Sequence, residues 1–145
     1  MTESSAPSNV AETVAEADAD KREEICRQTI TRFGTAWAAG DVDELMSLMS
    51  DEPRYRGSTG PDPGNEFVGS EQVRAAFERI AGPNAGSEPP KHAPPPEMYF
   101  FGNRALAFWR LKFPGSDREV EGVDVMTFTN DGRIAVKDAY RKAFS

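Results

Sequence analysis

The residue with the clearest chemical meaning is Asp124, an acid in the middle of an apolar strand. Read with a period of two, the strand places Asp124 on one face together with Gly122, Met126 and Phe128. Burying an isolated carboxylate is costly, so an acid in this position must be paired, hydrogen-bonded or protonated. A carboxyl group held in such surroundings can carry a proton at a carbon next to a carbonyl, or at a carbonyl oxygen.

The alternative is a structural aspartate that bonds Trp109, a lysine or a backbone amide. Lys137 bears on this choice, because it is the cation on the neighbouring predicted strand. The apolar alternation from Ile134 to Tyr140 places Lys137 on the outward side, and we favour that interpretation. Asp124 then has no cation partner, and the substitution Asp124→Asn is expected to leave the stability nearly unchanged.

The remaining candidates are less specific. His92, the single histidine, precedes the last strands and is a candidate acid or base, although its proline-rich surroundings are also typical of an exposed loop. Tyr55 could offer its hydroxyl to a pocket or pack on the sheet. Five large side chains are either core residues or the wall of an apolar ligand pocket: Phe33, Trp37, Trp109, Met126 and Phe128.

Composition excludes several classes of protein. One cysteine and one histidine leave no basis for a disulfide framework or a Cys/His zinc site, and they fit a reducing, cytoplasmic compartment. No apolar run approaches the roughly 18 residues of a membrane span. Lysine and arginine do not cluster with aromatic residues, so we expect no nucleic-acid partner. We also expect no metal and no cofactor.

The charge is concentrated at the N-terminus. Of a net charge of −7, most lies in the first 24 residues, which hold seven acidic and two basic side chains. This acidic, Ala/Ser-rich composition predicts a disordered tail over residues 1–19, followed by one domain over residues 20–145.

Periodicity and turn signals give the elements of that domain. They predict, in chain order, a helix from Asp20 to Gly40, a short helix ending at Pro53, a strand at 54–56, a loop at 57–69, a helix from Ser70, a proline-rich loop at 81–96 and four antiparallel strands from Met98 onward. The order indicates an α+β fold whose helices cover one face of a curved sheet. The concave side of such a sheet usually forms the ligand pocket.

Three stretches also carry a family resemblance: AWAAGDVDELMSLMSDEPRYRGSTG at 36–60, GSEQVRAAF at 69–77 and GVDVMTFTNDGRIAVKDAY at 122–140. They resemble the SnoaL-like, ketosteroid-isomerase-like branch of the nuclear-transport-factor-2 (NTF2) superfamily. The resemblance implies a cone-shaped, curved antiparallel sheet wrapped around three helices, commonly dimeric through the outer sheet face. Members include isomerases, polyketide cyclases, dehydratases, epoxide hydrolases and non-catalytic binding modules.

Only some of the family's catalytic residues have counterparts in this sequence. Asp124 falls where ketosteroid isomerases place the aspartic acid that donates to the developing oxyanion. The isomerases' tyrosine falls at Phe33, which has no hydroxyl, and their base falls near Gly57, which has no carboxylate. SnoaL-type cyclases, which use one strand aspartate as acid and base, are the better match. The family register would also turn Lys137 towards the pocket, against the apolar alternation.

We therefore predict a cofactor-free isomerase or cyclase for a small, apolar, polycyclic ligand of polyketide, steroid or terpenoid type. Asp124 is the proton carrier and His92 is the candidate second group. The alternative is a non-catalytic ligand-binding or dimerisation module. Phe33 and Gly57 fit this alternative, because they stand where the isomerases have catalytic groups. A homodimer is expected because Val123 and Val125 would otherwise expose an apolar patch.

Overall fold

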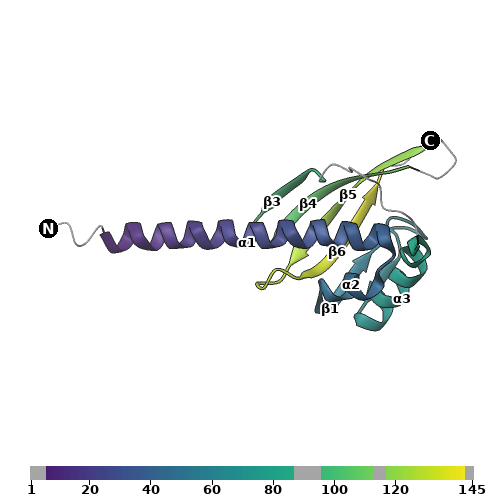
Figure 1. The fold of residues 1–145 in the computed structure, drawn as a ribbon, viewed down its shortest axis with the longest axis horizontal. Helices are drawn as coiled ribbons and strands as arrows, with labels where there is room; N and C mark the ends of the chain where they lie inside the picture. The colour runs from purple at the N-terminus through teal and green to yellow at the C-terminus, as the bar shows by residue number, and fades with distance from the viewer. Residues whose placement is uncertain (1–5, 87–95, 113–116, 143–145) are drawn as a thin grey trace.

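One curved six-stranded sheet forms the framework of the domain, and the long first helix crosses one of its faces (Figure 1). The computed structural model describes residues 6–86, 96–112 and 117–142. The elements are α1 (Ala6–Ala39), α2 (Val42–Ser47), β1 (Met49–Arg56), β2 (Glu66–Val68), α3 (Ser70–Ile80), the 3₁₀ helix η1 (Gly82–Asn84), β3 (Met98–Phe101), β4 (Arg104–Lys112), β5 (Glu119–Phe128) and β6 (Ile134–Arg141). The α+β class predicted from the sequence is confirmed.

The strand order is β2-β1-β6-β5-β4-β3. All neighbours are antiparallel except β1 and β6, which pair in parallel, so the sheet departs at this point from the expected antiparallel pattern. The predicted loop at 57–69 is also interrupted, because β2 forms at its end and pairs with β1. The parallel pairing brings the first strand of the chain beside the last one.

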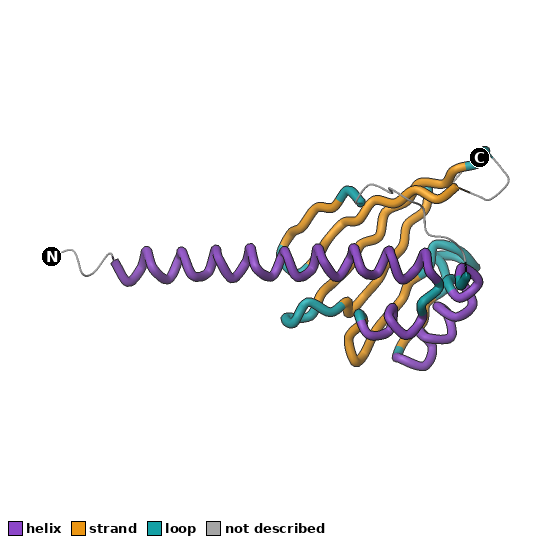
Figure 2. The backbone as a smooth tube through the Cα atoms, viewed as in Figure 1, coloured by secondary structure: helices purple, strands orange, loops and turns teal. Residues whose placement is uncertain are grey.

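Helix α1 is longer than predicted, since it begins at Ala6 and not near Asp20. Residues 6–19, expected to be disordered, are helical. Alanine and glutamate are strong helix formers, and Pro7 is tolerated in the first turn. Figure 2 shows that this part of α1 extends beyond the sheet. From residue 18 onward the first buried residue is Thr29.

An aromatic cluster fills the space between α1, α3 and the start of the sheet. Phe33 and Trp37 from α1, Phe77 from α3 and Tyr55 from β1 have ring centroids 5.3–6.4 Å apart where they meet. Phe67 of β2 stacks on Tyr55 at 5.7 Å. These rings fix α1 over the inner face of the sheet, and they form one wall of the site described below.

A β-bulge interrupts the pairing of β5 with β6. Thr127 pairs with Val136, but Phe128 pairs with Ile134, so Ala135 is an extra residue on β6. A bulge of this kind shifts the inward and outward alternation by one residue.

The shift decides which side chains of β6 face inward. Ile134, Lys137 and Ala139 are buried, whereas Tyr140 is 53% exposed. The alternation predicted from the sequence, with Tyr140 inward and Lys137 outward, is therefore wrong beyond the bulge.

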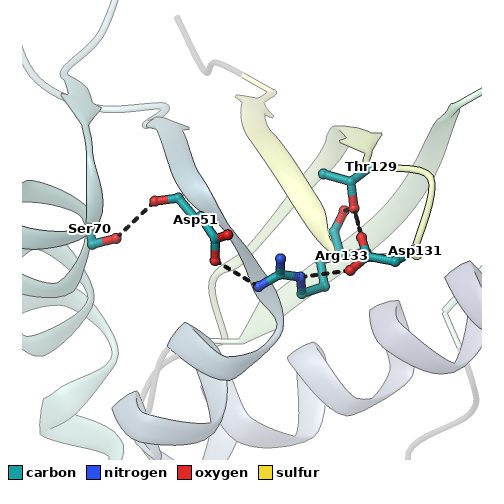
Figure 3. A network of polar contacts seen from close by, with 5 residues as sticks. All are labelled: Asp51, Ser70, Thr129, Asp131 and Arg133. Atoms are coloured by element: carbon teal, nitrogen blue, oxygen red, sulfur yellow. Dashed lines mark hydrogen bonds and ion pairs between the residues drawn. The ribbon is translucent and has the colours of Figure 1, made fainter.

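A polar network fixes the β5–β6 turn against β1 (Figure 3). The Thr129 hydroxyl donates to Asp131, and Arg133 pairs with both Asp131 and Asp51 at 3.1 Å. The hydrogen bond from Thr129 is the main cause that lowers the pKa of Asp131 below its usual value; desolvation opposes it, and the charge and hydrogen bond of Arg133 lower the pKa further. These groups are exposed, so their main effect is to hold the turn in position.

The outer face of the sheet carries an exposed apolar patch beside its charged pairs. In one row across three strands Phe108 lies opposite Val123, which lies opposite Tyr140. Tyr99 packs edge-on against Phe108. Tyr99, Phe108 and Tyr140 are between 41% and 53% exposed, and together these residues form a contiguous apolar patch.

The patch predicts a homodimer in solution. Light scattering should return a mass about twice the 15.9 kDa of the chain at micromolar concentration. Phe108→Glu should dissociate it, because a charge would be buried in the contact. The control Ile80→Glu changes an exposed apolar residue on α3 and should leave the dimer intact. A native protein of about 16 kDa would contradict the dimer.

Deleting residues 1–18 should leave the melting temperature nearly unchanged. The described residues between Asp18 and Ile25 are all exposed, so this end of α1 buries little apolar surface. Thermal unfolding monitored by circular dichroism measures the effect. A fall of more than a few degrees would show that the deleted segment packs on the domain.

Candidate functional site

Four side chains form a row across the inner face of the sheet: Trp109 of β4, Asp124 of β5, Lys137 of β6 and Tyr55 of β1. The strands are adjacent, and Tyr55 is the register partner of Lys137. Trp109 and Asp124 are diagonal neighbours on adjacent strands, and so are Asp124 and Lys137. We call these four residues the inner row.

Asp124 is the centre of the inner row. Its Oδ1 accepts a hydrogen bond from Nε1 of Trp109 at 3.1 Å and one from Nζ of Lys137 at 3.4 Å. The side chains of Asp124 and Lys137 are 13% and 7% exposed, so the ion pair is largely removed from water. The residues directly opposite Asp124 are small, Ala107 on one side and Ala139 on the other. Their size leaves the space through which the two long donors reach the carboxylate.

Gly122 allows Trp109 to reach Asp124. The indole lies across β5 so closely that a Cβ at Gly122 would come within 2.2 Å of Cζ2 of Trp109. It would also come within 2.4 Å of the carbonyl oxygen of Tyr140. Sequence reasoning placed Gly122 beside Asp124 without giving it a role. An isolated glycine inside a strand is the signal for such a close approach.

Aromatic rings surround the ammonium group of Lys137. Its Nζ lies 4.8 Å from the ring centroid of Trp37, 4.9 Å from that of Tyr55 and 5.8 Å from that of Phe33. Ring faces at these distances attract a cation, most strongly where water is excluded. Helix α1 and strand β1 therefore supply an aromatic cage, formed by Phe33, Trp37 and Tyr55, around the charge of Lys137.

The position of Lys137 corrects the interpretation that we favoured from the sequence. Lys137 faces inward and pairs with Asp124, as the family register implied, because the bulge at Ala135 reverses the alternation. The expectation that Asp124→Asn would be nearly neutral for stability thereby loses its basis. That substitution would leave the cation of Lys137 largely buried without its partner.

The other predicted residues are placed as follows. Met126 is buried on the inner face as the register partner of Lys137, next to the inner row. Phe128 is buried further along β5 beside Ile134, at the end of the strand and in the core. His92 lies outside the described residues.

The described part of the chain holds no group of three or more histidine, cysteine or acidic side chains arranged to bind a metal. None of its helices is long and apolar enough to cross a membrane.

The inner row combines three chemical capabilities. A carboxylate can accept and return a proton, and an ammonium group can donate to an oxygen on which negative charge develops. The flat faces of the surrounding rings can hold an apolar ring system. The arrangement is suited to proton transfer on a carbonyl compound.

Comparisons with known proteins agree with this architecture. Residues 30–137 match the family model of the SnoaL-like domain. No match was found among curated proteins.

Solved structures are similar at low sequence identity. An NTF2-like protein of unknown function from Mesorhizobium loti has 24% identity and a TM-score of 0.61, over 84% of this chain and 94% of its own. One from Burkholderia xenovorans LB400 has 21% identity and a TM-score of 0.61, over 86% and 88%. A candidate ketosteroid isomerase from Kribbella flavida DSM 17836 has 14% identity and a TM-score of 0.59, over 84% and 82%. These similarities show a shared fold.

Gly122→Ala should destabilise the domain by about 1–3 kcal/mol, because the new methyl group overlaps the indole of Trp109 and a backbone oxygen. Urea unfolding measures the change. Gly34→Ala is the matched control, since a Cβ there meets nothing within 4 Å and the helix should gain about 0.5–1 kcal/mol. Equal effects of the two substitutions would mean that Trp109 does not lie against Gly122.

Proposed function

Because the chain belongs to the SnoaL-like domain family, we propose that the inner row performs acid/base catalysis on a small polycyclic carbonyl compound. The reaction is an isomerisation or a ring closure in which a proton leaves one carbon and is returned to another. Asp124 carries the proton. No cofactor takes part in this scheme.

The observation that carries the proposal is the ion pair between Asp124 and Lys137 under a set of aromatic rings. An N–H of Lys137 donates to the carbonyl oxygen of the ligand and stabilises the charge that develops there. The Asp124 carboxylate takes the proton from the adjacent carbon and returns it to the rearranged skeleton. Lys137 thereby supplies the donor that Phe33 cannot provide.

The aromatic side chains around the ion pair support a flat, apolar ligand. Phe33, Trp37 and Tyr55 present rings around Nζ of Lys137, and Trp109 presents an indole on the other side of Asp124. Offset or edge-on contacts between rings add to the gain from burying apolar surface. A polycyclic polyketide, steroid or terpenoid would use both contributions.

The second candidate is a non-catalytic ligand-binding or dimerisation module. Two observations favour it: Phe33 has no hydroxyl where the isomerases have a tyrosine, and Gly57 has no carboxylate where they have a base. In a module the pair of Asp124 and Lys137 would serve only to satisfy two buried charges. The two candidates differ in whether the Asp124 carboxylate exchanges a proton with a bound carbonyl compound.

Exchange of the α-protons of β-tetralone in deuterium oxide, followed by proton NMR, tests the proposal. The native protein should accelerate exchange over buffer, and Asp124→Asn should reduce that acceleration by about 10²–10⁴. Asp138→Asn is the matched control. Asp138 lies on the adjacent strand β6 and pairs with Arg56 at 3.0 Å, so the rate should stay unchanged.

Two results would overturn the catalytic proposal. One is native protein that binds β-tetralone but exchanges its protons no faster than buffer, which is the behaviour of a module. The other is an equal loss of exchange in the Asp124→Asn and Asp138→Asn variants, which would place the active group elsewhere.

A further inference from the structure

We propose that Lys137 is an imine-forming residue, which joins its Nζ covalently to the carbonyl carbon of an aldehyde or ketone ligand. This inference rests on the proposed function and gives it a covalent step. It assigns to Lys137 a role beyond donation of a hydrogen bond.

The environment of Lys137 separates it from Lys21 and Lys142. Lys21 and Lys142 are exposed, whereas Lys137 is buried among ring faces. Within the described residues, Asp124 is the carboxylate that pairs with Nζ, at 3.4 Å, and the rings of Trp37, Tyr55 and Phe33 lie 4.8–5.8 Å from Nζ. Lysines that form imines are typically held in apolar surroundings of this kind.

Asp124 is placed to manage the protons of the reaction. It takes one proton from the ammonium group, which leaves a free amine beside the ligand. The amine lone pair attacks the carbonyl carbon, the C–N bond forms, and the π electrons of the C=O bond move to the oxygen. The oxygen takes up the proton lost by nitrogen and a second one returned by Asp124, and it leaves as water. The product is an iminium ion at Lys137 beside an ionised Asp124.

The imine would supply the electron-withdrawing group that removal of the adjacent proton requires. An iminium carbon withdraws electrons from the adjacent C–H bond, so the Asp124 carboxylate can remove that proton to give an enamine. The enamine is protonated at another carbon, and water then hydrolyses the imine and releases the product and the amine. This route requires neither the hydroxyl absent at Phe33 nor an added cofactor.

Reductive trapping tests the inference. The full-length protein is incubated with β-naphthaldehyde and sodium cyanoborohydride, and the modified lysine is identified by peptide mass mapping. Labelling at Lys137 should be about tenfold or more faster than at Lys142, because the cage places the aldehyde next to the amine. Lys142→Arg should leave the rate at Lys137 unchanged.

Lys137→Arg is the decisive variant, since arginine keeps the cation beside Asp124 but forms no imine under these conditions. It should lose the rapid label and still bind β-naphthalenemethanol, an alcohol of the same shape, as measured by fluorescence. Comparable labelling rates at Lys137 and Lys142 in the native protein would overturn the inference, and this result does not depend on the folding of any variant. Slow labelling together with fast exchange of β-tetralone would overturn the imine alone and leave the proposed function intact.

Discussion

One charge pair, formed by Asp124 and Lys137 on the inner face of the sheet, constrains the residues around it. Removing two charges from water costs several kcal/mol for each ion, and the attraction between them offsets this only when further polar contacts are made. Trp109 provides the hydrogen bond, and the rings of α1 and β1 provide faces for the cation. Gly122 makes room for the indole, and the bulge at Ala135 turns the lysine inward. Local features on four strands and one helix therefore serve a single interaction.

Much of this arrangement was predictable from periodicity and turn chemistry. The helices, the β5–β6 hairpin and the inward position of Asp124 follow from apolar spacing, as does the aromatic face of α1. The position of Lys137 does not, because the bulge at Ala135 is set by the pairing of β6 with β5 and leaves no mark in the local sequence. The start of α1 at Ala6 was missed because acidic, alanine-rich segments are compatible with both helix and disorder.

A buried ion pair is a poor way to stabilise a domain, since apolar residues of similar volume often do as well or better. The aromatic cluster between α1, α3 and β1 already buries apolar surface beside the pair. The pair contributes instead a proton acceptor and a proton donor, set 3.4 Å apart among ring faces. This is the physical reason for assigning Asp124 and Lys137 to chemistry on a ligand, and for expecting their joint removal to affect function more than stability.

A double-variant cycle in urea unfolding measures this claim directly, with Asp124→Asn, Lys137→Met and the two combined. Asparagine keeps the acceptor for Trp109, so the cycle reports the interaction between Asp124 and Lys137 and leaves the Trp109 contact in place. We predict that each single substitution costs about 3–5 kcal/mol, because it leaves one charge without its partner, and that the double variant is close to native stability. A double variant that loses the sum of the two single costs would contradict the account, because it would show that the two side chains stabilise the fold independently of each other.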